Sequence, residues 1–380
     1  MEQWREYRLG EICESVSESY RGKAEKVVLI NTSDVLEGEC LNHSKVPNKE
    51  LKGQFKKTFK ENDILYSEIR PVNRRYAYID FFAKDYIAST KLMVLRHNEK
   101  VLPKYLYYIL QSKDMIEELQ MLAEARSGTF PQITFDVLSK ECVMIPNINT
   151  QEKILAILTS LDNKIQLNRK INSNLEEQAK ALFKSWFIDF EPFKGGKFVD
   201  SELGKIPEGW EVCPLEQMGK FKRGKTIVAK NTKEGTVPVV AGGMEPAYYN
   251  NVANTKGPVI TVSASGANAG FMRLYFQDIW ASDCSFLDNT NENLLWIYCF
   301  LDNNRRVLRH AQTGAVQPHV KPADINSILV CVPVHELIDK FQNVVRPLFL
   351  TIGLLQSETM RLQRTRDTLL PKLMSGEIKV

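Results

Sequence analysis

The strongest constraint on the fold is an internal repeat, because one order of segments occurs twice along the 380 residues. The matched pairs are Trp4–Leu9 with Trp210–Leu215, Asp63–Ser67 with Gly257–Thr261, Ile87–Thr90 with Trp280–Asp283, Pro103–Leu110 with Glu292–Cys299, Ser127–Thr129 with Thr313–Ala315, and Val143–Pro146 with Val330–Pro333. The spacing between matched segments falls from 206 to about 187 residues along the chain. This change indicates insertions in loops, while the order of elements stays the same. The sequence therefore predicts two divergent copies of one domain.

Each copy ends in a long helix with a heptad pattern, in which mostly apolar residues alternate four and three residues apart. The first stripe is Ile154, Leu158, Leu161, Ile165, Asn168, Asn172, Leu175, Ala179, Leu182 and Trp186. The second is Ile338, Phe341, Val345, Leu348, Ile352, Leu355, Thr359, Leu362, Arg366, Leu369 and Leu373. We expect the two helices to pair as an antiparallel coiled coil; the alternative is two unrelated helices, each packed on its own domain.

The ends and polar positions of these helices carry further expectations. Asn149 and Thr150 are candidates for the start of the first helix, and Pro347 is expected to kink the second helix or shift its start. Asn168 and Asn172 are candidates for setting the register against Thr359 and Arg366.

The repeat and the helices divide the chain into five parts of a mixed α/β protein with pseudo-twofold symmetry. A stretch rich in glycine and proline separates the first helix from the second copy and is interpreted as a linker. The predicted parts are a first domain at 1–149, a central helix at 150–190, the linker at 191–209, a second domain at 210–335 and a C-terminal helix at 336–380.

Composition excludes several classes of protein. A hydrophobic fraction of 43% and a charged fraction of 25% are those of a globular chain, and the longest apolar runs are far shorter than the ~20 residues that cross a bilayer. Seven scattered cysteines without a C-x-x-C pair argue against a disulfide framework or a zinc finger. We expect a cytoplasmic protein with no membrane partner. A net charge of only +4 means that any nucleic-acid surface must be local.

One motif resembles a phosphate-binding loop, since Gly219–Thr226 satisfies G-x-x-x-x-G-K-[ST]. A poor strand with a proline precedes it, and a short turn-rich segment follows where a helix is needed. We interpret the match as a coincidence and its Lys220, Lys222, Arg223 and Lys225 as a basic turn.

Catalytic and metal-binding motifs are missing from the sequence. There is no [DNS]-P-P-[YFW] tetrapeptide, no H-E-x-x-H and no recognisable nucleophile elbow. Glu50–Lys52 and Glu377–Lys379 match E-x-K of metal nucleases, but neither has a suitable acidic partner upstream. We therefore expect a chain that is not an enzyme and holds no metal.

Recognition of DNA is the chemistry that remains, and four loops and the basic turn are candidates for it. Arginines interleaved with tyrosines between 70 and 78 suit phosphate contacts and bidentate reading of guanine, although a solvated hairpin tip is the alternative. Their counterpart near Asn268 offers hydroxyls and an amide that can pair with adenine, and the alternative is a plain turn. The candidates for DNA binding are Arg70, Arg74, Arg75, Arg126, Thr129, Lys222, Arg223, Lys225, Ser265, Asn268, Arg273, Gln312, Thr313 and Gln317.

Several segments, in the right order, resemble the specificity subunit of type I restriction-modification systems. They are Phe198–Trp210, Gln151–Leu155, Leu175–Phe187 and Thr365–Ile378. The resemblance implies two target-recognition domains that each read half of a bipartite site in double-stranded DNA, with the helices as a ruler. Helices of about 50 Å against ~34–36 Å per DNA turn give half-site centres about one turn apart or slightly more.

The same resemblance implies partners and cofactors. Two modification subunits dock on the helices and methylate adenine, and restriction (motor-nuclease) subunits join to cleave DNA. S-adenosylmethionine, ATP and Mg would be bound by these partners, and this prokaryotic chain itself would be non-catalytic with no cofactor. Trp186, Phe187, Ile188 and Phe190 are candidates for docking the modification subunit, and the alternative for them is a core at the end of the coil.

Two other functions stay open on the sequence alone. One is a scaffold that uses its coiled coil only to hold proteins together and does not read DNA. The other is a nucleotide-binding protein that uses Gly219–Thr226.

Overall fold

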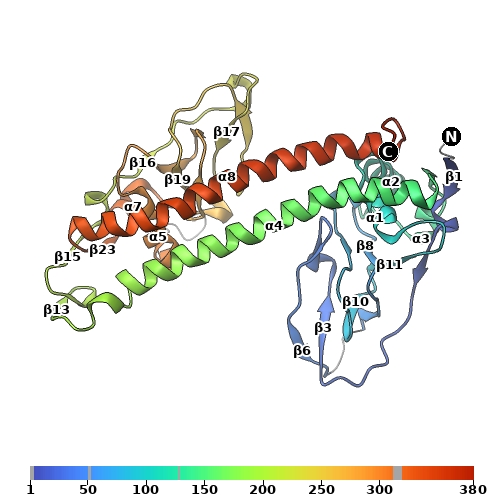
Figure 1. Cartoon of the computed structure of the whole chain (residues 1–380), viewed down its shortest axis with the longest axis horizontal. Coiled ribbons are helices and arrows are strands. Elements are labelled where there is room, and N and C mark those ends of the chain that lie inside the picture. Colours follow the sequence, from blue (N-terminus) through green and yellow to red (C-terminus); the bar gives the residue numbers. More distant parts are fainter. Residues whose placement is uncertain (1–3, 50–52, 127–128, 311–318) are drawn as a thin grey trace. The chain divides into compact units, whose positions relative to one another are not determined.

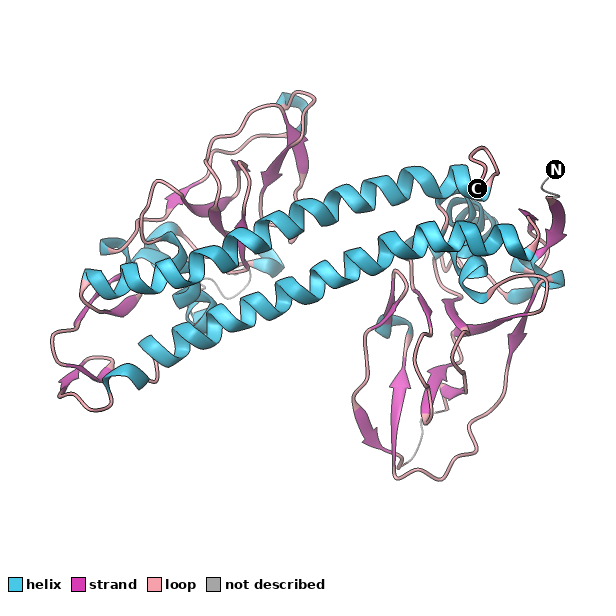
Figure 2. Cartoon of the chain, in the orientation of Figure 1, coloured by secondary structure: helices cyan, strands magenta, loops and turns pink. Residues whose placement is uncertain are grey.

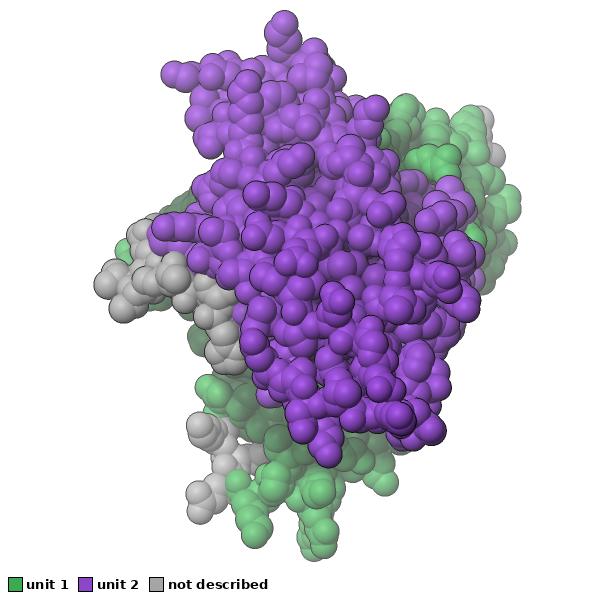
Figure 3. Space-filling view, turned by 90° about the vertical axis from the view of Figure 1, so that its left-hand side faces the viewer, with its two compact units in different colours: residues 1–165, 361–380 green, residues 166–360 purple. Residues whose placement is uncertain are grey.

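The structure is a computed structural model that describes residues 4–49, 53–126, 129–310 and 319–380. Helices and strands are mixed within it, as Figure 2 shows, so the expected mixed α/β class is confirmed. The chain forms two compact units, which Figure 3 colours separately. Unit 1 comprises residues 1–165 and 361–380, and unit 2 comprises residues 166–360. Both long helices therefore contribute to both units.

Unit 1 contains two four-stranded sheets. One is antiparallel with the order β2-β11-β8-β9, and the other has the order β6-β3-β10-β7, in which β10 runs parallel to β3. A separate antiparallel pair joins β1 to β12, so the first strand lies beside the strand that precedes the first long helix. The strands are β1 (Arg5–Arg8), β2 (Cys13–Val16), β3 (Lys26–Ile30), β4 (Val35–Leu36), β5 (Glu39–Cys40), β6 (Lys45–Pro47), β7 (Phe55–Lys57), β8 (Ile64–Ser67), β9 (Tyr76–Tyr78), β10 (Tyr86–Ser89), β11 (Leu92–His97) and β12 (Cys142–Ile145).

Three helices complete the globular part of unit 1: α1 (Pro103–Gln111), α2 (Lys113–Arg126) and α3 (Phe135–Leu138). Six consecutive residues of α1, from 105 to 110, are buried. This helix packs in one core with β8 and β11, and Ile154, Leu158 and Leu373 from the long helices join the same core.

Unit 2 repeats this plan, with a three-stranded sheet in place of the second four-stranded one. The antiparallel order β16-β22-β19-β20 corresponds to β2-β11-β8-β9, and the parallel pair β17·β21 corresponds to β3·β10. The pair β15·β23 corresponds to β1·β12. The strands are β13 (Phe198–Ser201), β14 (Gly204–Pro207), β15 (Glu211–Pro214), β16 (Lys222–Arg223), β17 (Val237–Val240), β18 (Tyr248–Asn250), β19 (Val259–Ser263), β20 (Met272–Tyr275), β21 (Trp280–Ala281), β22 (Cys284–Asp288) and β23 (Leu329–Val332).

The helices of unit 2 match those of unit 1 in order: α5 (Leu294–Asn303), α6 (Arg305–His310) and α7 (Pro322–Asn326). Its core centres on Trp296, which is fully buried. The segment interpreted as a linker contains the antiparallel hairpin β13–β14, and Trp210 just after it stacks edge-on against Phe190 and Phe193.

Short 3-10 helices also recur at matched places. The η1 helix after β1 corresponds to η5 after β15, and η3 after β8 corresponds to η7 after β19. The predicted internal repeat is thus confirmed by sheet order as well as by sequence. The 3-10 helices of the described residues are η1 (Leu9–Glu11), η2 (Thr32–Asp34), η3 (Pro71–Asn73), η4 (Glu191–Phe193), η5 (Leu215–Gln217), η6 (Ala229–Asn231) and η7 (Gly266–Asn268).

Two 40-residue helices, α4 (Ile148–Phe187) and α8 (His335–Met374), follow the two copies of the domain (Figure 1). The start of α4 differs from the expectation, because the amide of Thr150 donates to the side chain of Asn147 at 3.0 Å, which makes Asn147 the cap. The expected shift of the second start at Pro347 is wrong, since α8 begins at His335 and is continuous through that proline.

Contacts within unit 2 establish that the helices run antiparallel. Asn168 of α4 meets Glu358 of α8, while Phe187, further along α4, meets Phe341, further back along α8. The expected coiled-coil pairing is therefore confirmed. Most heptad positions are buried or half-buried, but near the end of α4 the fully buried rings are Phe183 and Phe187. The stripe turns there because α4 also packs against the globular core of unit 2.

Candidate nucleic-acid interface

The first candidate loop, around η3, is held in a strained conformation. Arg70 and Arg74 flank η3 with φ angles of 44° and 52°, in the left-handed region that is unfavourable for residues with a Cβ atom. The Arg70 amide donates to the carbonyl of Pro131 at 3.1 Å, and Ile69 forms an antiparallel bridge with Gln132. The arginine loop and the segment after α2 were separate candidates, and the fold brings them together. We call residues 70–75, Arg126 and residues 129–132 the first corner.

The side chains of the first corner are mostly open to solvent. Arg70, Arg74, Arg126 and Thr129 are all exposed. Arg74 lies 3.9 Å from Glu37, and both side chains of this ion pair are about half exposed or more, so the pair is weak. Three guanidinium groups are therefore available at this corner for an external anion.

Arg75 is held differently from its neighbours. It is half-buried, and its Nη1 donates to the carbonyl oxygens of Ser33 at 3.2 Å and Val35 at 3.4 Å. These bonds tie the loop to the segment before β5. In this conformation Arg75 braces the first corner from behind.

The second copy has a corner of the same construction. Here η7 takes the place of η3, and an antiparallel bridge between Ser265 and His319 takes the place of the bridge between Ile69 and Gln132. Gln312, Thr313 and Gln317 lie outside the described residues. We call residues 265–268 with Asp283 and His319 the second corner.

Asp283 organises the second corner. Its carboxylate accepts a hydrogen bond from the Ser265 hydroxyl at 3.0 Å and forms an ion pair with Arg223. Two residues from two different segments therefore converge on one carboxylate. The pair with Arg223 is partly exposed, so a phosphate that approaches from solvent can compete for the guanidinium group.

The other candidates of unit 2 lie around this corner. Lys222 and Lys225 are exposed, and Asn268 ends η7 with partial exposure. Arg273 is engaged internally: its Nη1 donates to the Met244 carbonyl at 2.8 Å and pairs with Glu245 at 3.2 Å. Arg273 thus braces unit 2 much as Arg75 braces unit 1.

The geometry of Gly219–Thr226 does not fit phosphate binding. The Gly224 amide donates to the Cys284 carbonyl and the Lys225 amide to the Ala281 carbonyl, both at 2.9 Å. These amides are used for sheet pairing and cannot cradle a phosphate. The described segment that follows contains the three-residue η6 and no α-helix before β17.

Polar groups cross the pair of long helices within each unit. In unit 1 the Asp162 carboxylate accepts from Arg366 at 3.0 Å and from the Tyr108 hydroxyl. Burial would lower the pKa of Arg366, but its hydrogen bonds to Asp162 and Asp367 outweigh burial and raise it. Burial and the Asp162 charge raise the pKa of Tyr108. At neutral pH the Arg366 side chain therefore stays charged and the Tyr108 hydroxyl stays protonated.

In unit 2 the buried amide of Asn168 donates to Glu358 at 2.8 Å and to Thr359 at 3.4 Å. The expected contact of Asn168 with Thr359 is thus present, whereas Arg366 meets Asp162 instead of an asparagine. The Oδ1 atom of Asn168 has no hydrogen-bond partner among the described residues.

The aromatic candidates for docking pack inside unit 2. Phe187 is 6% exposed, and its ring lies 5.1 Å from that of Phe341 and 5.9 Å from that of Trp296. Trp186 is half-buried beside Phe341. In this structure these rings belong to the core at the end of the helix pair.

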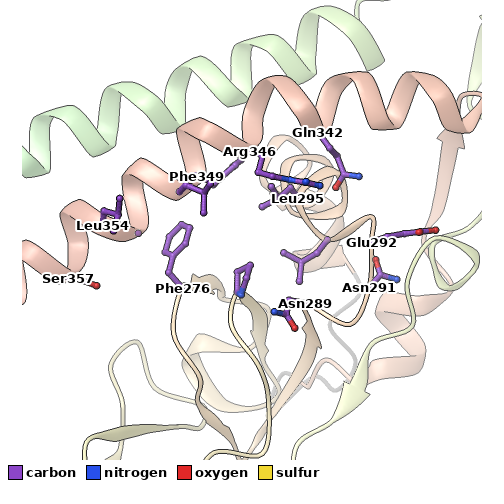
Figure 4. Close-up of a pocket in the computed structure, with 14 residues that line it drawn as sticks. Phe276, Asn289, Asn291, Glu292, Leu295, Gln342, Arg346, Phe349, Leu354 and Ser357 are labelled. Atoms are coloured by element: carbon purple, nitrogen blue, oxygen red, sulfur yellow. The ribbon is translucent and has the colours of Figure 1, made fainter.

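A groove of about 570 Å³ runs along α8 in unit 2 (Figure 4). Leu350 and Leu354 of α8 are 62% and 72% exposed at this groove, and Phe276 and Phe349 form part of its wall. The rim is polar and includes Arg346 and Glu292. An apolar floor with a charged rim is typical of a surface that binds another protein.

Within the parts of the chain that the structure describes, no group of three His, Cys, Asp or Glu residues is placed to hold a metal ion. No helix of those parts is long and apolar enough to span a membrane.

Sequence reasoning missed three residues of the corners. Asp283 was seen only as the end of a repeated segment, although the repeat changes there from Thr90 to an acid. Val72 and Phe130, which are exposed at the first corner, were overlooked because apolar residues are usually expected in the core of a protein. Their positions in the sequence could have identified them. Val72 lies between the candidates Arg70 and Arg74, and Phe130 follows the candidate Thr129.

Comparison with known proteins identifies the family. The family model described as the type I restriction modification DNA specificity domain matches residues 1–177 and 207–342. The type I restriction enzyme HindI specificity subunit of Haemophilus influenzae is 33% identical, with all of both chains covered. The MjaIX specificity subunit of Methanocaldococcus jannaschii is 32% identical over 74% of this chain and 70% of its own.

A solved structure supports the fold. The crystal structure of the S subunit of a type I restriction-modification system from M. genitalium has a TM-score of 0.61 and 18% identity, covering 98% of this chain and 96% of its own.

A repeated α/β domain with two basic or polar corners and a paired long helix defines a nucleic-acid recognition protein built from two similar modules. The chain belongs to the family of type I restriction-modification DNA specificity proteins. The resemblance and the specificity function expected from the sequence are confirmed, and the scaffold and nucleotide-binding alternatives are not favoured. Proteins of this family are in general non-catalytic and work in complexes with DNA and other subunits.

Proposed function

We propose that this chain reads one half of a bipartite DNA site with each unit, and that the first and second corners make the base and phosphate contacts. The observation that carries this proposal is the matched pair of bridges, Ile69 with Gln132 and Ser265 with His319. Each bridge joins two loops of suitable residue type at the same place in the repeated domain. A bipartite site needs two such surfaces that share a backbone arrangement and differ in their side chains.

The two corners suggest different readout. At the first, Arg70, Arg74 and Arg126 supply cations for phosphate and for guanine edges. At the second, Ser265 and Asn268 supply neutral groups that donate and accept hydrogen bonds. Lys222, Arg223 and Lys225 beside them would contact the backbone.

The complex would contain two modification subunits and, for cleavage, restriction subunits. We propose that one modification subunit docks in the α8 groove, where Leu350 and Leu354 offer apolar area that unit 2 leaves uncovered. This chain would carry no catalysis and no cofactor, and its partners would bind S-adenosylmethionine, ATP and Mg. It would act in the cytoplasm, where its DNA target lies.

The test is to express the chain with its modification subunit in a host without other methylation and to map modified adenines by long-read sequencing. We expect one two-part motif with a fixed spacer that depends on this chain. Replacing residues 210–335 with those of another family member should change one half of the motif and keep the other. Modification without a motif, or a motif that ignores the swap, would overturn the proposal.

A second arm tests the first corner. Changing Arg70, Arg74 and Arg75 together to alanine should abolish motif-specific modification, because both the external contacts and the brace of the loop are lost. The matched control removes the same charge from the exposed Lys45, Lys60 and Lys84 of unit 1. Intact modification by the arginine variant would exclude this corner as the reading surface.

A further inference from the structure

Three large apolar side chains are exposed at or beside the first corner. Val72 is 57% exposed, Met121 64% and Phe130 69%. Among the described residues of unit 1, the other large apolar residues that are more than half exposed are Leu41 and Phe82. Leaving such side chains in water forfeits the gain of burying them, so a cluster of them marks a contact surface.

Hydrogen bonds bring these three residues together. The amide of Val72 donates to the side chain of Gln120 at 3.2 Å, which places η3 over α2 next to Met121. The Arg70 amide donates to the Pro131 carbonyl and Ile69 forms a bridge with Gln132, so Phe130, the neighbour of Pro131 in the chain, lies beside the loop that carries Val72. The apolar cluster is therefore part of the corner and not a separate patch.

Cations lie in the same segments as these apolar residues. Arg70 and Arg74 flank η3, Arg126 ends α2, and all three are exposed. A protein partner for three exposed apolar groups would not need these guanidinium groups, whereas a DNA duplex presents phosphates on either side of apolar points at its bases. In the major groove that apolar point is the 5-methyl group of thymine, which distinguishes an A·T pair from the others.

We infer that Phe130, supported by Val72, contacts the 5-methyl group of a thymine in the half-site that unit 1 reads. This inference rests on the proposed function and names one base feature that the first corner recognises. The three arginines hold the phosphates and guanine edges on either side, and the ring fills the space against the methyl group. Replacing that thymine by a base without the methyl group leaves the ring against water.

The second corner lacks this arrangement. By the matched 3-10 helices, Ala267 stands where Val72 stands in the first corner. By the matched bridges, the position in sequence that corresponds to Phe130 is Gln317, which lies outside the described residues. The dependence on a thymine methyl group through this pair is therefore expected in one half-site only.

The experiment uses the complex of the full chain with its modification subunits and DNA duplexes that carry the mapped motif. Each thymine of both half-sites is replaced in turn by uracil, which keeps every hydrogen-bonding group and removes only the methyl group. For the wild-type complex we expect one position in one half-site to weaken binding by about fourfold, the effect of one buried methyl group.

The variant Phe130→Ala completes a double-mutant cycle, in which the other change is the replacement of thymine by uracil. It should bind the thymine duplex at least about fourfold more weakly than wild type and show no further loss with uracil at that position. Phe130→Leu should recover part of both effects. The matched control is Phe82→Ala, which removes a ring that is 79% exposed in the loop after β9, at the other end of that strand from η3. This control should bind like wild type and keep the loss with uracil.

The outcomes separate the inference from the proposed function. Sequence-specific binding with no sensitivity to uracil, or a Phe130→Ala complex that loses the same further factor, overturns the inference and leaves the proposed function standing. Binding that ignores the motif altogether overturns both. The uracil scan of the wild-type complex needs no variant, so it decides the question even if a substitution impairs folding.

Discussion

Asp63 shows how a single charged residue holds the sheet that supports the first corner. Its side chain is fully buried, and both carboxylate oxygens accept hydrogen bonds from Arg96, each at 2.8 Å. It also accepts from the Lys60 amide at 2.9 Å, which fixes the turn before β8. The pair joins β11 to the start of β8, and η3 follows from the other end of β8.

The first prediction is that Asp63→Asn lowers the free energy of unfolding of this sheet by about 3 kcal/mol, because Arg96 loses its buried counter-charge. Hydrogen exchange of β8 and β11 amides measures the effect locally. The control is Glu117→Gln, which breaks the exposed pair with Lys113 and should cost less than about 0.5 kcal/mol. Equal effects of the two changes would mean that the Asp63 pair contributes no more than a surface ion pair.

At the scale of elements, the helix pair contains a polar group that its stability does not require. The amide of Asn168 is buried between α4 and α8, and its Oδ1 atom has no partner among the described residues. We predict that Asn168→Leu raises the free energy of unfolding by about 1 kcal/mol, because an apolar side chain of similar size replaces a half-satisfied amide.

Urea unfolding followed by circular dichroism of the helices measures this change. Leu175→Ala is the control for a stripe position that should lose stability in the ordinary way. A loss of stability in Asn168→Leu would show instead that the bonds to Glu358 and Thr359 are worth more than the buried amide costs.

The elements also show where reasoning from sequence succeeds. The two long helices and the repeated order of elements were predictable because the hydrophobic period and the internal repeat agree. The shift of the buried face of α4 from Leu182 to Phe183 could not be predicted. A heptad pattern indicates only the contact with the partner helix, and α4 also packs against the globular core of unit 2.

The candidate site was predictable in part for a similar reason. Residue type selected Arg70 and Arg126, but only the bridge between Ile69 and Gln132 puts their loops together. Sequence could not separate exposed Arg70 from Arg75, because the difference lies in the two carbonyl groups that Arg75 reaches across the fold.

At the scale of the whole molecule, the α8 groove predicts how the complex assembles. We expect Leu354→Asp to weaken assembly with the modification subunit by about tenfold or more, because a charge would enter an apolar interface. The control is Val344→Asp on the same helix, 51% exposed but not among the residues that line the groove. Size-exclusion chromatography with light scattering measures the assembly. Equal behaviour of the two variants would remove the groove from the interface.

The net charge of +4, from 50 basic and 46 acidic residues, predicts how affinity for DNA is shared in the complex. Each phosphate neutralised contributes about −0.9 to the slope of log K against log salt concentration. Two corners with about three cations each would give the isolated chain a slope of about −5 or shallower. The complex should have a steeper slope, by about −4 or more, because its partners supply the further phosphate contacts.

Titrations of one labelled duplex at several salt concentrations, with and without the modification subunit, measure both slopes. The control is a duplex with a scrambled motif. The complex should bind it more weakly but with most of the same salt dependence, because phosphate contacts carry no sequence information. Equal slopes for the chain and the complex would mean that this near-neutral chain makes all the phosphate contacts itself. The corners would then have to be more basic in the bound state than the structure shows, with Arg75 and Arg273 released from their internal partners to reach the DNA.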